Sequence, residues 1–162
     1  MTKVGTAMAA AATAVLLWAG APAAFAAGGS SDSPAASQKP EDPTYTAGVA
    51  AVKAKDYARA ITLLEQVVAK DAQNADALNY LGYSNRELGK LDQALSYYEK
   101  ALAVDPKHRG AHEYLGELYL KKGDMKNAEV QLAKLDDLCT FGCEEYRELK
   151  RKIAAAKSGK SS

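Results

Sequence analysis

The chain has 162 residues, of which 48% are apolar and 25% are charged, which is enough for about one domain with a buried core. Lys and Arg together number 21, and Asp and Glu number 20. This balance gives no electrostatic reason to expect binding to nucleic acid or to an anionic membrane surface.

Residues 1–26 have the pattern of a signal peptide. One positive charge, Lys3, precedes an apolar stretch, and small residues at Ala24 and Ala26 form a cleavage site of the Ala-x-Ala type. The sequence therefore predicts an exported bacterial protein, periplasmic or secreted, cleaved near Ala26. The alternative is a retained membrane anchor, because the apolar stretch is long enough to span a bilayer. Alanine and glycine make it a weak membrane segment.

Residues 27–44 are rich in Gly, Ser, Pro and charged residues, with almost nothing to bury. This composition predicts a disordered linker. The residue directly after the predicted cleavage point is Ala27 and not cysteine, so the sequence does not support a lipid anchor there.

Small residues then recur with a period of 34. Two series, one of glycine and one of alanine, keep this spacing: Gly48, Gly82, Gly116, and Ala60, Ala94, Ala128. A fixed period of this length indicates stacked supersecondary units. We expect these positions to be packing positions, where a larger side chain would push neighbouring helices apart.

The middle copy carries the fullest pattern, which reads Leu78-x2-Leu81-Gly82-x2-Asn85, Ala94-x3-Tyr98 and Pro106. This pattern resembles the tetratricopeptide repeat, with copies at residues 41–74, 75–108 and 109–142. The resemblance implies an all-α fold of three stacked helix hairpins, a right-handed α-solenoid, over residues 45–157.

Helices are expected at residues 44–54, 57–70, 75–88, 91–104, 109–121 and 125–137. Gly89 and Gly123 should end the first helices of their repeats, and Lys55 should do so less well. Residues 143–157 form an amphipathic pattern that predicts a capping helix for the stack. Residues 158–162 read as a disordered tail.

The resemblance also implies a concave groove lined by the first helix of each repeat. Its predicted partner-binding residues are Tyr45, Asn79, Tyr83, Arg86, Glu113, Glu117 and Lys121. We expect binding on the second and third repeats, where two glutamates one turn apart would form a negative patch. One alternative is that Glu113 and Glu117 are only an ordinary solvated helix face. Another is that the partner binds the convex face or the linker instead of the groove. A Lys/Asn/Arg carboxylate clamp is not expected, because Tyr45, Val49, Tyr80, Gly110 and Tyr114 stand at its positions.

Two cysteines, Cys139 and Cys143, are separated by three residues. In an exported protein, an even cysteine count favours a structural disulfide. The pair could instead carry out redox chemistry or bind Cu(I). His108 and His112 lie four residues apart but have no third ligand nearby, so they do not form a convincing metal site. Gly159-Lys160-Ser161 in the carboxyl-terminal tail lacks the earlier glycine of a phosphate-binding loop.

The sequence therefore predicts a non-enzymatic scaffold that binds a protein or peptide, with no cofactor and no metal. The alternative function is an exported thiol-redox or copper-binding protein that uses the two cysteines. The sequence does not predict the partner's identity or the oligomeric state.

Overall fold

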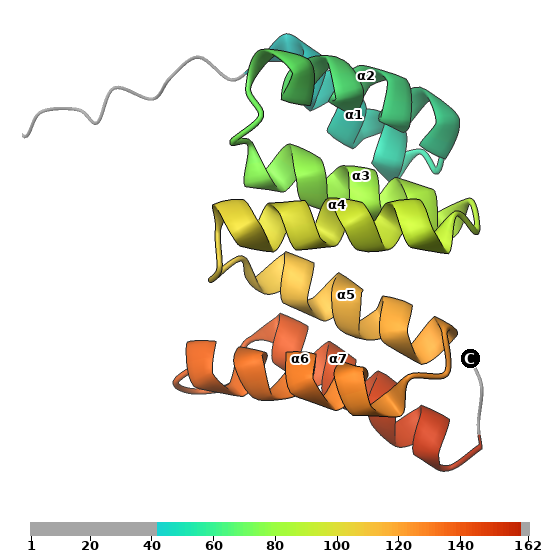
Figure 1. Cartoon of the computed structure of the whole chain (residues 1–162), viewed down its shortest axis with the longest axis vertical. Helices are drawn as coiled ribbons and strands as arrows, with labels where there is room; N and C mark the ends of the chain where they lie inside the picture. Colours follow the sequence, from blue (N-terminus) through green and yellow to red (C-terminus); the bar gives the residue numbers. More distant parts are fainter. Residues whose placement is uncertain (1–41, 160–162) are drawn as a thin grey trace, which may run out of the picture. The chain divides into compact units, whose positions relative to one another are not determined.

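The computed structural model describes residues 42–159, and helices are the only regular secondary structure in this part of the chain, as predicted (Figure 1). The predicted signal peptide, most of the predicted linker and residues 160–162 lie outside the described residues. Between residues 42 and 159 the elements are α1 (Pro43–Lys53), α2 (Tyr57–Lys70), α3 (Ala75–Glu87), α4 (Leu91–Val104), α5 (Arg109–Lys121), α6 (Met125–Leu138) and α7 (Glu144–Lys157). These bounds agree with the expected helices to within one residue.

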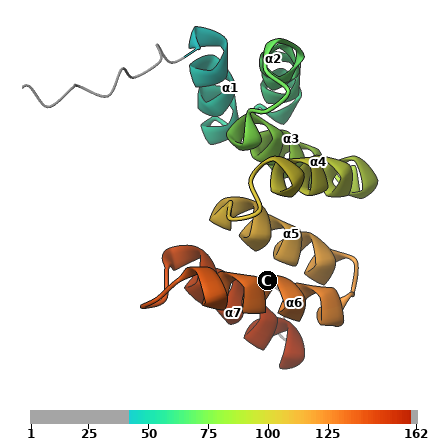
Figure 2. The same cartoon turned by 60° about the vertical axis from the view of Figure 1, so that its left-hand side comes forward.

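The helices form three hairpins, α1–α2, α3–α4 and α5–α6, which stack in chain order, and α7 lies beside α5 and α6 (Figures 1 and 2). The first hairpin is at one end of the stack, and the α6–α7 loop is at the other. Within residues 42–159, no helix is both long and apolar enough to cross a membrane.

The first helix overlaps the predicted linker by two residues. Proline fits the first helical position, because its fixed φ suits a helix and its missing N–H has no partner there anyway. Pro43 takes this position, and the Asp42 carboxylate caps the helix by accepting a 2.7 Å hydrogen bond from the Thr44 N–H. The linker prediction was therefore wrong at residues 43 and 44, which are helical.

Polar caps also start most of the later helices. Asp56, Asn74 and Asp124 each accept a hydrogen bond from a backbone N–H three residues on, at 2.9–3.2 Å. Gly89 and Gly123 adopt positive φ after the first helices of their repeats, as predicted, and Lys55 takes this backbone conformation at the same repeat position with φ 60°.

The hairpins close over the repeated glycines. A Cβ atom added at Gly82 would lie 2.5 Å from the Tyr98 ring, and one at Gly48 would lie 2.8 Å from the Leu64 side chain. Both neighbours stand on the second helix of the same repeat. The alanines Ala60, Ala94 and Ala128 are fully buried. Small residues therefore allow the two helices of a hairpin to pack closely.

The third repeat departs from this arrangement. A Cβ atom at Gly116 would meet Leu149, which belongs to α7, instead of a residue of α6. Leu149 and Ile153 pack with Ala128 and Leu135 of α6 in one buried cluster. The capping helix thus covers α5 directly, and this decides how much of the third repeat is open to a partner.

Candidate partner-binding groove

Tyrosines form the open part of the groove. Tyr83 stands at the centre, with its ring centroid 5.1 Å from that of Tyr114 and 6.0 Å from that of Tyr57. Tyr45 and Tyr80 lie 6.3 Å apart beside them. These five rings come from α1, α2, α3 and α5, and all are only partly buried. Such rings offer a large, stiff contact surface with polar tips.

A cavity of about 290 Å³ opens among four of these rings, those of Tyr57, Tyr80, Tyr83 and Tyr114. Its other lining residues come from the end of α1 and the adjoining α1–α2 turn, namely Val52, Lys53 and Lys55. Both lysines are exposed. The cavity therefore has an aromatic lining and a positively charged rim.

Arg86 lies beneath the tyrosines. It is only 4% exposed, and its guanidinium carbon stands 5.1 Å from the Tyr83 ring centre and 5.5 Å from that of Tyr114. It pairs with Glu117 and, at 3.2 Å, with Glu87. A buried charge that is paired and stacked in this way is a rigid support for the groove rather than a contact offered to a partner.

The predicted negative patch is wrong. Glu117 is 6% exposed and is bound by Arg86 on one side and by Lys152 of α7 on the other. Because Glu117 is buried and its negative charge is compensated by two cations, it does not offer a negative surface to a partner. The third-repeat part of the groove is instead a second cavity of about 450 Å³, walled on one side by α7 and bordered by the exposed Lys121.

Glu113 stands on α5, close to the charged residues of α7. Burial raises its pKa to about 7, and the neighbouring carboxylates of Glu117, Glu145 and Glu148 add to this effect, while Lys152 opposes it. Glu113 therefore carries only part of its negative charge near neutral pH.

Asn79 is also less available than predicted. It is 5% exposed, and its amide nitrogen lies near Gly110, where an added Cβ atom would be 3.3 Å away. Its Oδ1 atom has no hydrogen-bond partner among the described residues. The side chain lies between α3 and α5, and it cannot reach an extended peptide without a rearrangement.

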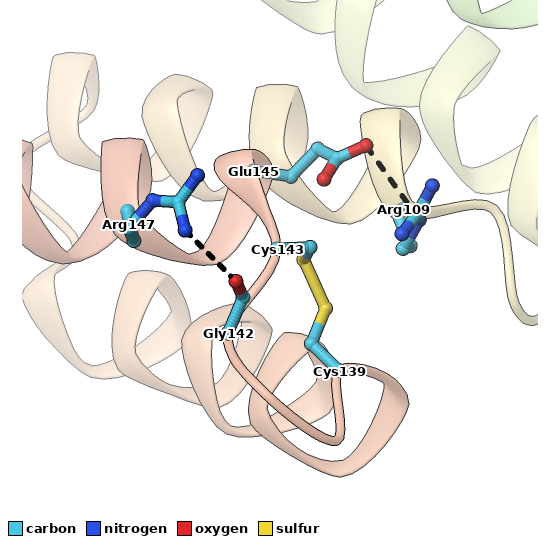
Figure 3. The surroundings of a disulfide bond; sticks show 6 residues. All are labelled: Arg109, Cys139, Gly142, Cys143, Glu145 and Arg147. Atoms are coloured by element: carbon cyan, nitrogen blue, oxygen red, sulfur yellow. Dashed lines mark hydrogen bonds and ion pairs between the residues drawn. A yellow bond between two sulfur atoms is a disulfide. The ribbon is translucent and has the colours of Figure 1, made fainter.

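The two cysteines lie at the α6–α7 junction (Figure 3). They are joined as a disulfide, with Cα atoms 5.5 Å apart, and Cys143 is the N-cap residue of α7. Arg147 donates a 3.0 Å hydrogen bond to the Gly142 carbonyl, which braces the same loop. Within residues 42–159, no group of three or more His, Cys, Asp or Glu side chains could hold a metal ion.

The two histidines have structural partners. His108 caps α5 by accepting a hydrogen bond from the Ala111 N–H, and its other ring nitrogen lies 3.1 Å from Asp76, which raises the pKa of the histidine. His112 is buried, with ring nitrogens near the Gln131 amide and the Pro106 carbonyl.

A family model described as "Tetratricopeptide repeat" matches residues 45–103 and 84–136. Together the two matches cover more than half of the chain. The chain belongs to the tetratricopeptide repeat family.

Individual proteins with tetratricopeptide repeats are similar to the chain as well. It is 31% identical over 91 residues to "Tetratricopeptide repeat protein 37" of Xenopus laevis; this stretch is 52% of the chain but only 6% of that relative. Among solved structures, the Sgt2 TPR domain from Aspergillus fumigatus matches with 28% identity and a TM-score of 0.63, covering 76% of this chain and 86% of that one.

A second solved structure shares the fold at lower identity. It is the Yersinia enterocolitica type III secretion chaperone SycD in complex with a peptide of the translocator YopD. The identity is 20% and the TM-score 0.62, with 72% of this chain and 88% of that chain covered.

Three tyrosines of the tetratricopeptide groove, Tyr57, Tyr80 and Tyr114, were missing from the predicted set. Tyr80 lies next to Asn79 on α3, and Tyr57 is the first residue of α2, outside the first helices that the family pattern assigns to the groove. The recurrence of tyrosine at positions 80 and 114, one period apart, is a signal that the sequence does contain.

Proposed function

We propose that this chain is an exported, non-enzymatic scaffold that binds an extended segment of a partner protein along its tyrosine groove. The observation that carries the proposal is a set of five partly buried tyrosines. Four of them, Tyr57, Tyr80, Tyr83 and Tyr114, line one cavity, and Tyr45 lies against Tyr80 beside it. Tyrosine anchors protein interfaces because it buries a large apolar area at a low cost in conformational entropy.

The first two repeats are the main docking surface in this proposal. The third repeat is partly covered, because Leu149 and Lys152 of α7 contact Gly116 and Glu117 of α5. The tyrosine cavity is lined from α1, α2, α3 and, through Tyr114, α5, and none of its lining residues belongs to α7. The peptide bound by SycD, a protein of the same fold, supports this mode of binding.

The rim of the cavity suggests the chemistry of the partner. Lys53 and Lys55 are exposed, whereas the negative charge of Glu117 is compensated. A segment that carries an aromatic or large apolar side chain next to acidic residues would fit an aromatic cavity with a positive rim. This differs from the basic segment that an exposed negative patch would favour.

Export is the second part of the proposal, and it rests on the sequence of residues 1–26. Amino-terminal sequencing of the protein from its native host tests it. We expect the mature chain to begin at Ala27 or Gly28. Recovery of an intact terminus at Met1 or Thr2 in the membrane fraction would favour the anchor instead.

Selection from a displayed peptide library tests the groove. Peptides that bind the natural protein should lose at least about fivefold in affinity when Tyr80 and Tyr83 are both changed to alanine. Tyr97→Ala is the matched control, because Tyr97 is also partly buried but stands on the second helix α4. Equal binding by the groove variant and the natural protein would exclude this surface.

A further inference from the structure

One aromatic residue is presented outward. Phe141 lies in the α6–α7 loop and is 97% exposed, whereas the next most exposed large apolar side chains, Val130 and Leu88, reach only 46% and 43% among the described residues. An apolar ring in water is a favourable site for contact with another surface, because its burial releases water.

The loop that carries Phe141 is held in place. The disulfide between Cys139 and Cys143 closes it, the Gly142 N–H donates to the Cys139 carbonyl at 3.2 Å, and Arg147 donates to the Gly142 carbonyl at 3.0 Å (Figure 3). A side chain on a constrained backbone loses little freedom when it binds, so more of the contact energy appears as affinity.

The same molecule contains a cavity suited to such a ring. The tyrosine cavity described above has about 290 Å³, at the lower limit of a small-molecule site and sufficient for one aromatic side chain. Phenylalanine has no polar tip, so it can enter an aromatic pocket without leaving a hydrogen-bonding group unpaired.

The charges near the loop are mainly negative, and those that line the cavity are positive. Asp136, Asp137 and Glu144 are exposed close to Phe141 in the chain and outnumber the exposed Arg147, which donates to the Gly142 carbonyl. Lys53 and Lys55 are exposed at the cavity. Complementary charges of this kind orient two surfaces as they approach and accelerate association.

The loop lies beyond the third hairpin, away from the first-repeat side of the cavity. The cavity is lined from the α1–α2 turn across α3 to Tyr114 of α5, whereas Phe141 is in the α6–α7 loop. The first hairpin is at one end of the stack and the α6–α7 loop is at the other (Figures 1 and 2). One copy is therefore unable to fill its own cavity without unstacking its repeats.

We propose that Phe141 of one copy binds in the tyrosine cavity of a second copy, so that the protein associates head to tail. The proposal rests on the groove of the proposed function and names one occupant for it. Because the two contacting surfaces differ, each added copy leaves one loop and one cavity free, and the contact builds open chains or a closed ring.

Sedimentation velocity of the purified protein over a range of concentrations tests the proposal. We expect the average mass of the natural protein to rise with concentration, and less so at high salt. Phe141→Ala should raise the dissociation constant at least about fivefold. The double variant Lys53→Glu with Lys55→Glu should do the same from the cavity side. Val130→Ala is the control for loss of an exposed apolar side chain, and it should associate as the natural protein does.

Mixing the two defective variants gives the sharper result. Phe141→Ala keeps an intact cavity, and the lysine variant keeps an intact loop, so the mixture should form one-to-one dimers and nothing larger. Circular dichroism checks that both variants are folded. A natural protein that stays monomeric, a Phe141→Ala variant that associates normally, or a mixture without dimers would each overturn the proposal.

These outcomes separate self-association from peptide binding. If the protein stays monomeric while selected peptides still depend on Tyr80 and Tyr83, only the head-to-tail contact fails. If the mixture forms dimers but selected peptides bind the Tyr80 and Tyr83 variant normally, self-association stands and the groove is not a general peptide site.

Discussion

The first two repeats and the third repeat use the same sequence period for different packing. Gly48 and Gly82 are each covered by the second helix of their own hairpin, whereas Gly116 is covered by Leu149 of the capping helix. The groove side of α1 and α3 is therefore open in the first two repeats, whereas α7 covers part of the corresponding side of α5 in the third repeat. A repeated glycine predicts that another helix packs closely against that position. Which helix does so depends on the neighbouring segments of the chain.

The largest expected effect is at Gly82. Gly82→Ala places a Cβ atom against the fully buried ring of Tyr98, which cannot move aside, and should lower the free energy of unfolding by about 2–3 kcal/mol. Gly110→Ala is the matched control, since its Cβ atom would meet only side-chain atoms at 3.3 Å or more. It should stay within about 0.5 kcal/mol of the natural protein. Coincident urea melts of the two variants would contradict the packing described for the regular repeats.

The disulfide should have the next largest effect. Replacing Cys139 and Cys143 by serine should lower the free energy of unfolding by about 2 kcal/mol, because the five-residue loop is then no longer closed in the unfolded chain. Amide exchange should rise in α7 before α3 and α4. Thiol titration before and after denaturation is the companion measurement. Thiols that react freely in the folded, unreduced protein would show that the bridge is absent.

Gly116→Ala tests directly whether the third repeat packs differently from the first two. The added Cβ atom would lie 2.5 Å from Leu149, as close as at Gly82, but Leu149 stands on a terminal helix that can move away. We expect a loss of about 1–2 kcal/mol, confined to α7 and seen as faster amide exchange over residues 144–157. Equal loss of protection across α1–α4 would mean that the third repeat and the first two unfold as one unit.

Glu113 should make the stability of the folded protein depend on pH. Its pKa is about 7 in the folded protein, above its ordinary value of 4.5, so between these two pH values the folded state binds more protons than the unfolded state. Stability should therefore fall as pH rises from about 4.5 to 7 and should level off above 7. The loss attributable to this group is roughly 1–2 kcal/mol, less than the full shift implies, because the side chain is partly exposed.

Glu113→Gln removes that titration. The variant should be more stable than the natural protein at pH 8, and the difference should vanish near pH 4. Glu99→Gln on α4 provides the control, since Glu99 is exposed. Thermal melts at a series of pH values give the comparison. An unchanged pH profile in Glu113→Gln would show that this carboxyl group does not titrate near neutral pH.

The smallest effect is expected inside the second repeat. The Tyr98 hydroxyl is buried and has no hydrogen-bond partner among the described residues. Tyr98→Phe removes an unpaired polar group and keeps the ring against Gly82, so stability should stay within about 0.5 kcal/mol or rise. A clear loss of stability in a urea melt would reveal a hydrogen bond to this hydroxyl.

Much of the fold could be predicted from local sequence signals. Asp56, Asn74, Gly89 and Gly123 mark helix ends through groups that act within a few residues, so the helix bounds were correct to one residue. The start of α1 was predicted one residue late, at residue 44, because the Asp42-Pro43 pair, a cap and a favoured first residue, was assigned to the linker.

The site was harder to predict, because burial depends on contacts between helices. The family pattern assigns Arg86 and Glu117 to the groove, and nothing local shows that they pair with each other 31 residues apart. Lys152 reaches Glu117 from α7, a helix outside the repeat pattern. Such contacts depend on the position of the cap, which the period does not specify.

The loop between α6 and α7 also changes how the molecule would respond to proteolysis. Phe141, almost fully exposed in a short loop, is a natural target for a protease that cleaves after aromatic residues. A cut there falls between Cys139 and Cys143, so the disulfide would keep α7 covalently attached to the rest of the domain. The nicked protein would run as one piece on a non-reducing gel and as two on a reducing gel. In an environment rich in proteases, the protein could be cut at its most exposed side chain and still keep its cap.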